Sequence, residues 1–204
     1  MTGKLEGFQS ISTNTSTNEY CKKQNTKNDP DNICTHCYSW TMLKTFRKNM
    51  APALERNSIL LNSKILHPDA LPVINQAFFR FNSHGELALD KKKATINLIN
   101  YINIAIKNPH CNFALWTKRF DIIKPYFDKN KKPKNFILVY SNPKINHIFK
   151  KPPKHFDRTF NNVYEDIEVK KQNCTGQKCK DCLLCYKLDT TNTIVEKVKS
   201  YGKK

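Results

Sequence analysis

Apolar and β-branched runs alternate with segments of helical periodicity along most of this chain. Strand-like runs cover residues 7–13, 73–81, 112–117, 135–140 and 161–170. Helical spacing or helix-start signals cover residues 40–50, 52–61, 94–107, 120–127 and 190–201, whereas residues 14–31 are polar and predict a loop. This alternation predicts an α/β fold in which helices cover a parallel sheet.

About five βα units, connected with the usual right-handed crossover, suit a partial (incomplete) βα barrel or an open parallel sheet. Both forms place the ligand site at the carboxyl ends of the strands. The residues expected to share that rim are Cys21, Cys34, Cys37, Gly85, Glu86, Thr117, Lys118, Tyr140 and Ser141. We expect residues 1–170 to form the core and residues 171–204 to form a cysteine-rich, metal-binding tail and terminal helix on the same domain.

The chain is strongly basic, with 35 Lys and Arg against 17 Asp and Glu in 204 residues and a net charge of +18. Between Lys118 and Arg158, twelve basic residues stand against three Asp. Such a stretch either meets nucleic-acid phosphates through the Lys-rich loops 129–134 and 150–154 or forms a solvated, charge-rich surface. We expect the two loops to lie at opposite ends of the sheet, which argues against one continuous patch.

The cysteine content indicates the compartment. Residues 1–6 are followed by no apolar stretch of the export-signal type, and the longest apolar run, residues 136–140, is too short to span a membrane. Eight cysteines without such a signal favour thiolate ligands over disulfides. We therefore expect a cytoplasmic protein, in a reducing compartment and without a membrane partner.

Seven of the cysteines fall into two groups with metal-ligand spacing. Cys34 and Cys37 form a C-x-x-C pair that Cys21 can join across a flexible loop. The second group stands within twelve residues near the carboxyl terminus and consists of Cys174, Cys179, Cys182 and Cys185. Soft thiolates select zinc or iron–sulfur clusters, and both kinds of site use repeated C-x-x-C intervals. The eighth, Cys111, is expected to be a small buried hydrophobe.

Seven ligands do not divide into two sets of four. Three thiolates leave an open position on a 4Fe-4S cluster, whereas a structural zinc site takes four. The odd count favours iron–sulfur, with an open cluster on Cys21, Cys34 and Cys37 and a closed one on the tail. A partition that gives one tail cysteine to the front site stays open, and so does zinc.

Several segments together resemble a known family. They are Ile33-Cys-Thr-His-Cys-Tyr38, Arg80-Phe-Asn-Ser-His-Gly-Glu86, Phe113-Ala-Leu-Trp-Thr-Lys118 and the final cysteine group. The chain from about residue 7 to residue 186 is similar to the phage gene product 88-like proteins, a family without a settled function whose layout is similar to that of radical SAM proteins. The resemblance implies that Gly85 and Glu86 hold the methionine part of S-adenosylmethionine. The chain departs from the radical SAM pattern in its long step from Cys21 to Cys34 and in having His84 where that turn has glycine.

Other residues near these motifs each have two interpretations. Glu86 either pairs with a ligand ammonium group or faces solvent, and Lys118 is suited to an anionic ligand. His36 and His84 are expected to be surface or capping residues rather than metal or proton-handling groups. We expect Arg80 to form a buried salt bridge within its strand, and Trp40 and Trp116 to belong to the core.

These observations leave two hypotheses for function. The first is a radical SAM-like iron–sulfur enzyme of unknown substrate. The second is a basic binding module, stapled by zinc or iron–sulfur, that contacts nucleic acid or a host protein without catalysis. The sequence has no P-loop, no G-x-S-x-G and no H-E-x-x-H motif, so phosphoryl transfer, serine hydrolysis and zinc proteolysis lack support.

Overall fold

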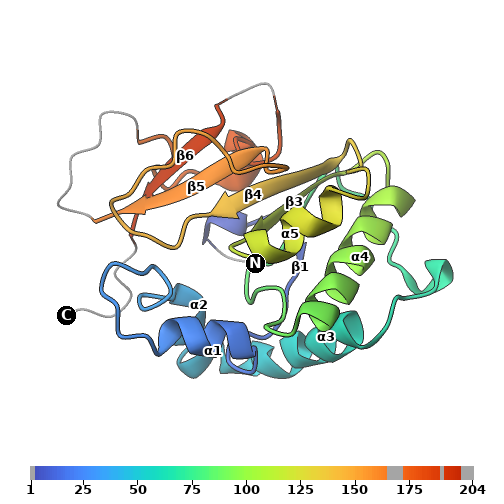
Figure 1. Ribbon diagram of the computed structural model, residues 1–204, viewed down its shortest axis with the longest axis horizontal. Helices are drawn as coiled ribbons and strands as arrows, with labels where there is room; N and C mark the ends of the chain where they lie inside the picture. The colour runs from blue at the N-terminus through green and yellow to red at the C-terminus, as the bar shows by residue number, and fades with distance from the viewer. Residues whose placement is uncertain (1–2, 165–171, 189–190, 199–204) are drawn as a thin grey trace.

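A computed structural model describes residues 3–164, 172–188 and 191–198 (Figure 1). Its centre is a six-stranded parallel sheet in the order β1-β2-β3-β4-β5-β6. The strands are β1 (Gln9–Ile11), β2 (Phe78–Phe81), β3 (Asn112–Thr117), β4 (Phe136–Ser141), β5 (Arg158–Val163) and β6 (Thr193–Lys197). Each strand joins the edge left by the one before, as in a βα barrel. No pairing between β1 and β6 closes the sheet within the described residues.

Helices occupy most of the connections between strands and lie mainly on one face of the sheet, whereas residues 142–157, between β4 and β5, hold no helix. The α-helices are α1 (Glu19–Asn25), α2 (Tyr38–Lys44), α3 (Ala51–Ser63), α4 (Lys91–Lys107), α5 (Phe120–Phe127) and α6 (Cys179–Cys182). Short 3-10 helices occupy Gly3–Leu5, Lys48–Met50 and Pro68–Ala70. Asp90 caps α4 by accepting a hydrogen bond from the Lys93 amide at 2.8 Å, and no described helix is long and apolar enough to cross a membrane.

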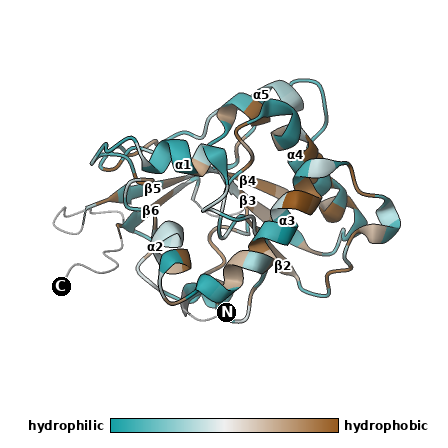
Figure 2. Ribbon diagram, turned by 90° about the horizontal axis from the view of Figure 1, so that it is seen from below, coloured by the Kyte–Doolittle hydropathy of each residue, from teal (hydrophilic) through white to brown (hydrophobic). Residues whose placement is uncertain are grey.

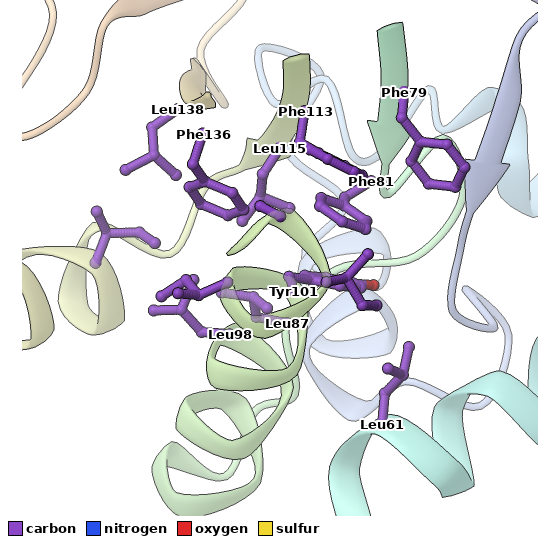
Figure 3. Packing of buried hydrophobic residues seen from close by; sticks show 14 of the residues in the cluster. Leu61, Phe79, Phe81, Leu87, Leu98, Tyr101, Phe113, Leu115, Phe136 and Leu138 are labelled. Carbon is purple, nitrogen blue, oxygen red and sulfur yellow. The ribbon is translucent and has the colours of Figure 1, made fainter. Parts of the chain in front are cut away.

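Alternate residues of the strands build two separate apolar clusters. On the outer face, the Phe81 ring stacks between Tyr101 of α4 and Phe113 of β3, with ring centroids 4.2 and 5.2 Å away (Figure 3). On the inner face, Trp116 and Val139 pack with Phe8 and with Tyr186 from the tail. Figure 2 shows the central strands β3 and β4 in brown and α1 mostly in teal. The outer face is therefore covered by helices, and the inner face is covered in part by the two ends of the chain.

The observed elements correct several sequence expectations. The helix expected over 190–201 is wrong, because residues 193–197 form β6 and pair with β5; residues 199–201 lie outside the described residues. Residues 14–31 are not all loop, since α1 begins after Asn18, whose side chain accepts from the Cys21 amide. The helix expected over 40–50 begins at Tyr38 and ends at Lys44, and the strand expected over 73–81 begins only at Phe78.

Candidate functional site

The carboxyl ends of the central strands meet at one rim, as predicted. The Glu86 carboxylate, five residues after β2, accepts hydrogen bonds from Thr117 Oγ1 at 2.6 Å and from the Lys118 amide at 2.8 Å. Lys118 Nζ then donates to Ser141 Oγ at 2.9 Å. Glu86, Lys118 and Ser141 border a cavity of about 870 Å³, a size typical of small-molecule sites.

A turn at residues 83–86 fixes one wall of this cavity. Gly85 has φ +77°, and a Cβ atom there would lie 2.1 Å from Thr13 Oγ1 and 2.5 Å from Thr13 O. The Gly85 amide donates to Thr15 Oγ1 at 2.8 Å, and the Thr13 amide donates to His84 O at 3.2 Å. Gly85 therefore combines a positive φ with a close backbone approach to Thr13.

Glu86 is buried, so the alternative of a solvent-facing carboxylate is wrong. Its side chain accepts a third hydrogen bond, from the Leu87 amide at 2.9 Å. Burial raises the pKa of Glu86, while the neighbouring Lys118 charge and the three donated hydrogen bonds act in the opposite direction. The carboxylate borders the cavity, but its first role is to tie the ends of β2 and β3 together.

The front cysteines come from three different local structures. Cys21 lies in α1, Cys34 lies in the following loop, and Cys37 is the N-cap residue of α2. The loop is anchored where the Ile33 amide donates to Pro143 O at 2.8 Å, in the connection after β4. All three cysteines line the cavity. Burial raises the pKa of the Cys21 and Cys34 thiols, and the Lys118 ammonium group opposes that rise.

The tail cysteines reach the same cavity from the inner face of the sheet. Cys174, Cys179 and Cys185 line it, and Cys182 accepts a hydrogen bond from Gln177 Nε2 at 3.4 Å. Cys174 Sγ accepts from Lys4 Nζ at 3.3 Å. Burial raises the pKa of Cys174, Cys179 and Cys185, and the charge of Arg80 opposes this at Cys179 and Cys185.

Proximity of the thiols does not amount to a preformed metal site. All eight cysteines are free. Within residues 3–164, 172–188 and 191–198, no three His, Cys, Asp or Glu side chains stand together so as to hold a metal ion. The tail as a metal-binding element, and the division of seven cysteines into an open and a closed site, therefore stay predictions. Cys111 is fully buried against β3, in the interior position expected of it.

Comparison with protein families gives one match, which covers most of the sequence. Residues 8–191 match the family described as gene product 88. The chain belongs to the gene product 88 family, a family of phage proteins. No curated protein and no solved structure matches the chain. The likeness to radical SAM proteins is thus a prediction that no comparison bears out.

Arg80 corrects another expectation for this member of the family. Its guanidinium carbon lies 3.9 Å from the centroid of the Trp116 ring, and both residues line the cavity. No ion pair joins Arg80 to an acidic side chain in the described part of the chain, so the expected salt bridge is wrong. The side chain is held by the indole ring instead. Trp116 is a core residue, as expected, and is also part of the cavity wall.

The two histidines near the cysteines, His36 and His84, differ in their burial and in their hydrogen-bond partners. His84 is buried, with its Nδ1 atom 2.7 Å from Ser39 Oγ, so the expectation of a surface residue is wrong. Burial, together with the charges of Arg47 and Arg80, lowers the pKa of His84 to about 4. His36 places Nε2 3.0 Å from Pro30 O and thereby braces its own loop.

Sequence reasoning missed a chain of hydroxyl groups along the cavity wall. Ser83 Oγ lies 2.7 Å from Ser12 Oγ and 3.1 Å from Ser10 Oγ, and the Tyr38 hydroxyl donates to Ser83 O. Ser10 and Ser12 are separated by one residue, so they share the inner face of the sheet. The alternation of Ser10 and Ser12 on either side of the apolar Ile11 was the available signal.

The two Lys-rich loops lie side by side, contrary to expectation. Asp128 accepts hydrogen bonds from Lys154 Nζ at 2.7 Å and from His155 Nε2 at 2.8 Å, and Lys132 forms an ion pair with Asp157. The reason is topological, because both loops precede a parallel strand and must therefore sit at the amino edge of the sheet. The two loops therefore share the amino edge of the sheet, opposite the rim that carries the front cysteines.

Proposed function

We propose that this chain is an iron–sulfur protein whose cysteine thiolates open onto a small-molecule cavity. The observation that carries the proposal is the convergence of two cysteine groups, distant in sequence, on one cavity in a parallel sheet. Reduced thiols that serve only as apolar filler have no reason to gather at a cavity, and Cys111 is the example of such filler in this chain.

The charges around the thiols fit anionic thiolate ligands. Burial alone keeps these thiols protonated, which is unfavourable for metal binding, but a bound cation deprotonates a coordinating thiol. Lys118 lies close enough to all three front cysteines for its charge to interact with each of them. Arg80 does the same for Cys179 and Cys185. Zinc would be held by the same donors, and an odd ligand count favours iron–sulfur.

The finer proposal is a radical SAM-like enzyme. It is supported by sequential parallel strands and by the turn at Ser83–Glu86 beside the front cysteines at the carboxyl rim. Gly85 would supply the close backbone approach and Glu86 the carboxylate for the ammonium group of S-adenosylmethionine. When bound, that cofactor supplies radical chemistry.

One preparation tests the metal, and single substitutions test the ligands. Oxygen-free purification followed by a visible spectrum and assays of iron, sulfide and zinc should give a coloured protein with iron and acid-labile sulfide. Cys34→Ser should lower the iron content and leave the protein folded, whereas Cys185→Ser should also lower stability, because a closed site adds folding free energy. Cys111→Ser is the matched control and should keep its full iron content. A colourless protein that holds only zinc contradicts the iron–sulfur proposal.

Calorimetry separates the finer proposal from the coarser one. Cluster-loaded protein should bind S-adenosylmethionine, and Glu86→Gln should weaken that binding by about tenfold to a hundredfold through loss of a charge-assisted hydrogen bond. If the loaded wild type shows no binding, the radical SAM-like reading is lost while the iron–sulfur proposal stands.

A second candidate function, binding of nucleic acid, is favoured by the neighbouring Lys-rich loops. Lys129, Lys131 and Lys134 are exposed and take part in no ion pair of the described residues. If about five phosphates are neutralised, the log–log salt slope on duplex DNA should be near −4.5. Charge reversal at these three lysines should abolish binding, whereas reversal at the control set Lys91, Lys92 and Lys93, which begins α4 at the other edge, should preserve it. Equal effects of the two sets would indicate non-specific attraction to a basic protein.

A further inference from the structure

Arg80 brings to the wall of the cavity a positive charge that forms no ion pair within the described residues. It lies in β2, in register with Ser10 of β1 and Ala114 of β3. These neighbours are small, and the guanidinium carbon of Arg80 lies over the Trp116 ring. The Nε atom is buried and has no hydrogen-bond partner in the described part of the structure. The Tyr186 hydroxyl lies within hydrogen-bonding reach of the Arg80 side chain, but it is neutral, and a buried charge without a counter-charge is costly.

The carboxylates that border the cavity are engaged elsewhere. Glu86 accepts three hydrogen bonds from its own neighbours. Glu196 forms an ion pair with Lys4, and Glu6 forms one with Lys178. Arg47 and Lys118 line the cavity as well, and Lys118 donates to a neutral hydroxyl. The five basic side chains of the lining thus outnumber its three carboxylates. The cavity therefore has positive charge in excess and favours an anion.

We propose that Arg80 is the oxyanion-binding residue of this cavity and takes the carboxylate or phosphate group of a small-molecule ligand. The planar guanidinium fork matches two oxygen atoms of either group. The guanidinium carbon lies over the Trp116 ring, and Ser10 and Ser12 line the same cavity. The inference names the ligand class of the cavity in the proposed function, but it does not require that a metal be bound.

Trp116 supplies the signal for a binding test, because it contacts the guanidinium group. The chain has two tryptophans, so a Trp40→Phe background leaves Trp116 as the reporter. Full-length protein as isolated is titrated with inorganic phosphate, with malonate, and with chloride at matched ionic strength. Phosphate or malonate should give a saturable fluorescence change and chloride should not. Whichever of the two oxyanions binds more tightly identifies the ligand group as a phosphate or a carboxylate.

Variants then assign the binding to Arg80. Arg80→Gln should weaken the affinity by about tenfold to a hundredfold, and Arg80→Lys should weaken it less, because it keeps the charge but loses the fork. Lys131→Gln, which removes one charge at the far edge of the sheet, should have no effect. If Arg80→Gln fails to fold by circular dichroism, Arg80→Lys decides. The proposal is overturned if Arg80→Lys and Arg80→Gln bind the oxyanion as tightly as the wild type does. It is also overturned if chloride gives the same fluorescence change as phosphate and malonate.

Metal content measured on the same samples keeps the two proposals apart. Arg80-dependent oxyanion binding by a protein without metal contradicts the iron–sulfur proposal and supports this one. Loss of metal in Arg80→Gln with unchanged oxyanion affinity means that Arg80 is the charge partner of the tail thiolates, and this inference is then wrong.

Discussion

Replacing Gly85 by alanine tests whether the turn at the end of β2 is as tightly held as its contacts indicate. A Cβ atom at residue 85 would lie 2.1 Å from Thr13 Oγ1 and 2.5 Å from Thr13 O. Ordinary contact requires roughly 3.5 Å, so the backbone of one segment must move by about 1 Å. Movement there would weaken the hydrogen bonds that join the turn to residues 13–15.

Two effects set the expected loss of stability in Gly85→Ala. Positive φ costs a non-glycine residue roughly 1–2 kcal/mol, and overpacking against an unyielding backbone costs about 1–3 kcal/mol. Gly85→Ala should therefore lose about 2–5 kcal/mol of unfolding free energy. The matched control is Gly7→Ala, because Gly7 has a similar φ of +80° but its nearest neighbour is a flexible Lys180 side chain at 3.4 Å. It should lose only about 1–2 kcal/mol.

Urea denaturation of the two variants beside the wild type measures the difference. In a chain of this length each kcal/mol corresponds to a shift of about 2–4 °C in Tm, so a thermal scan also resolves it. Cys21 provides a second measurement, because Asn18 at the start of its helix donates to Glu86 O at 2.7 Å. Gly85→Ala should make Cys21 more accessible to a thiol reagent. If Gly85→Ala loses no more stability than Gly7→Ala, the turn is not held against Thr13 and the reasoning fails.

Three further substitutions test separate contacts. His84 has a folded-state pKa of about 4, below its unfolded value of 6.5, so its contribution to stability is present above pH 6.5 and is lost as pH falls toward 4. The loss should reach about 3 kcal/mol in urea titrations across pH and should disappear in His84→Asn. Glu86→Gln should cost about 1–3 kcal/mol, because an amide NH2 group then faces donors, and urea titration at pH 7 measures it. Asn100→Ala should cost about 2–4 kcal/mol by the same assay, since the Asn100 side chain joins α4 to the backbone of residues 61, 64 and 66; an unchanged midpoint would mean that water replaces those bonds.

The elements that the sequence predicted well are those with dense apolar runs. Strand β3 has the predicted bounds of residues 112–117, and α5 those of 120–127, because their buried residues follow one periodicity. The rim was predictable as well, since parallel strands bring their carboxyl ends together whatever the details of the connections. Strand β6 was missed although its signal was local, because Thr193, Ile194 and Val195 are β-branched residues typical of a strand, and they pair with β5.

The errors in the candidate site have the same origin in tertiary contacts. Arg80 was expected to find a carboxylate, and nothing local shows that the cavity carboxylates are already engaged. Glu86 was judged by its neighbours in sequence, whereas its burial depends on the ends of β2 and β3. The two Lys-rich loops were expected at opposite ends of the sheet because strand β4 lies between them in the sequence. Each loop, however, immediately precedes a parallel strand, and both therefore lie at the amino edge of the sheet.

The position of the cysteine tail links the fold to the proposed chemistry. A sheet that does not close leaves its inner face without a partner, and here Tyr186 covers that face by packing on Phe8 and Trp116. Cys179 and Cys185 flank this contact and pack against the same cluster. Anything bound to the tail thiols would therefore act on the inner core directly, and its removal would loosen the support of Trp116 and hence of Arg80. Stability, thiol chemistry and ligand binding should accordingly change together when the tail is altered, and separately when the front cysteines are.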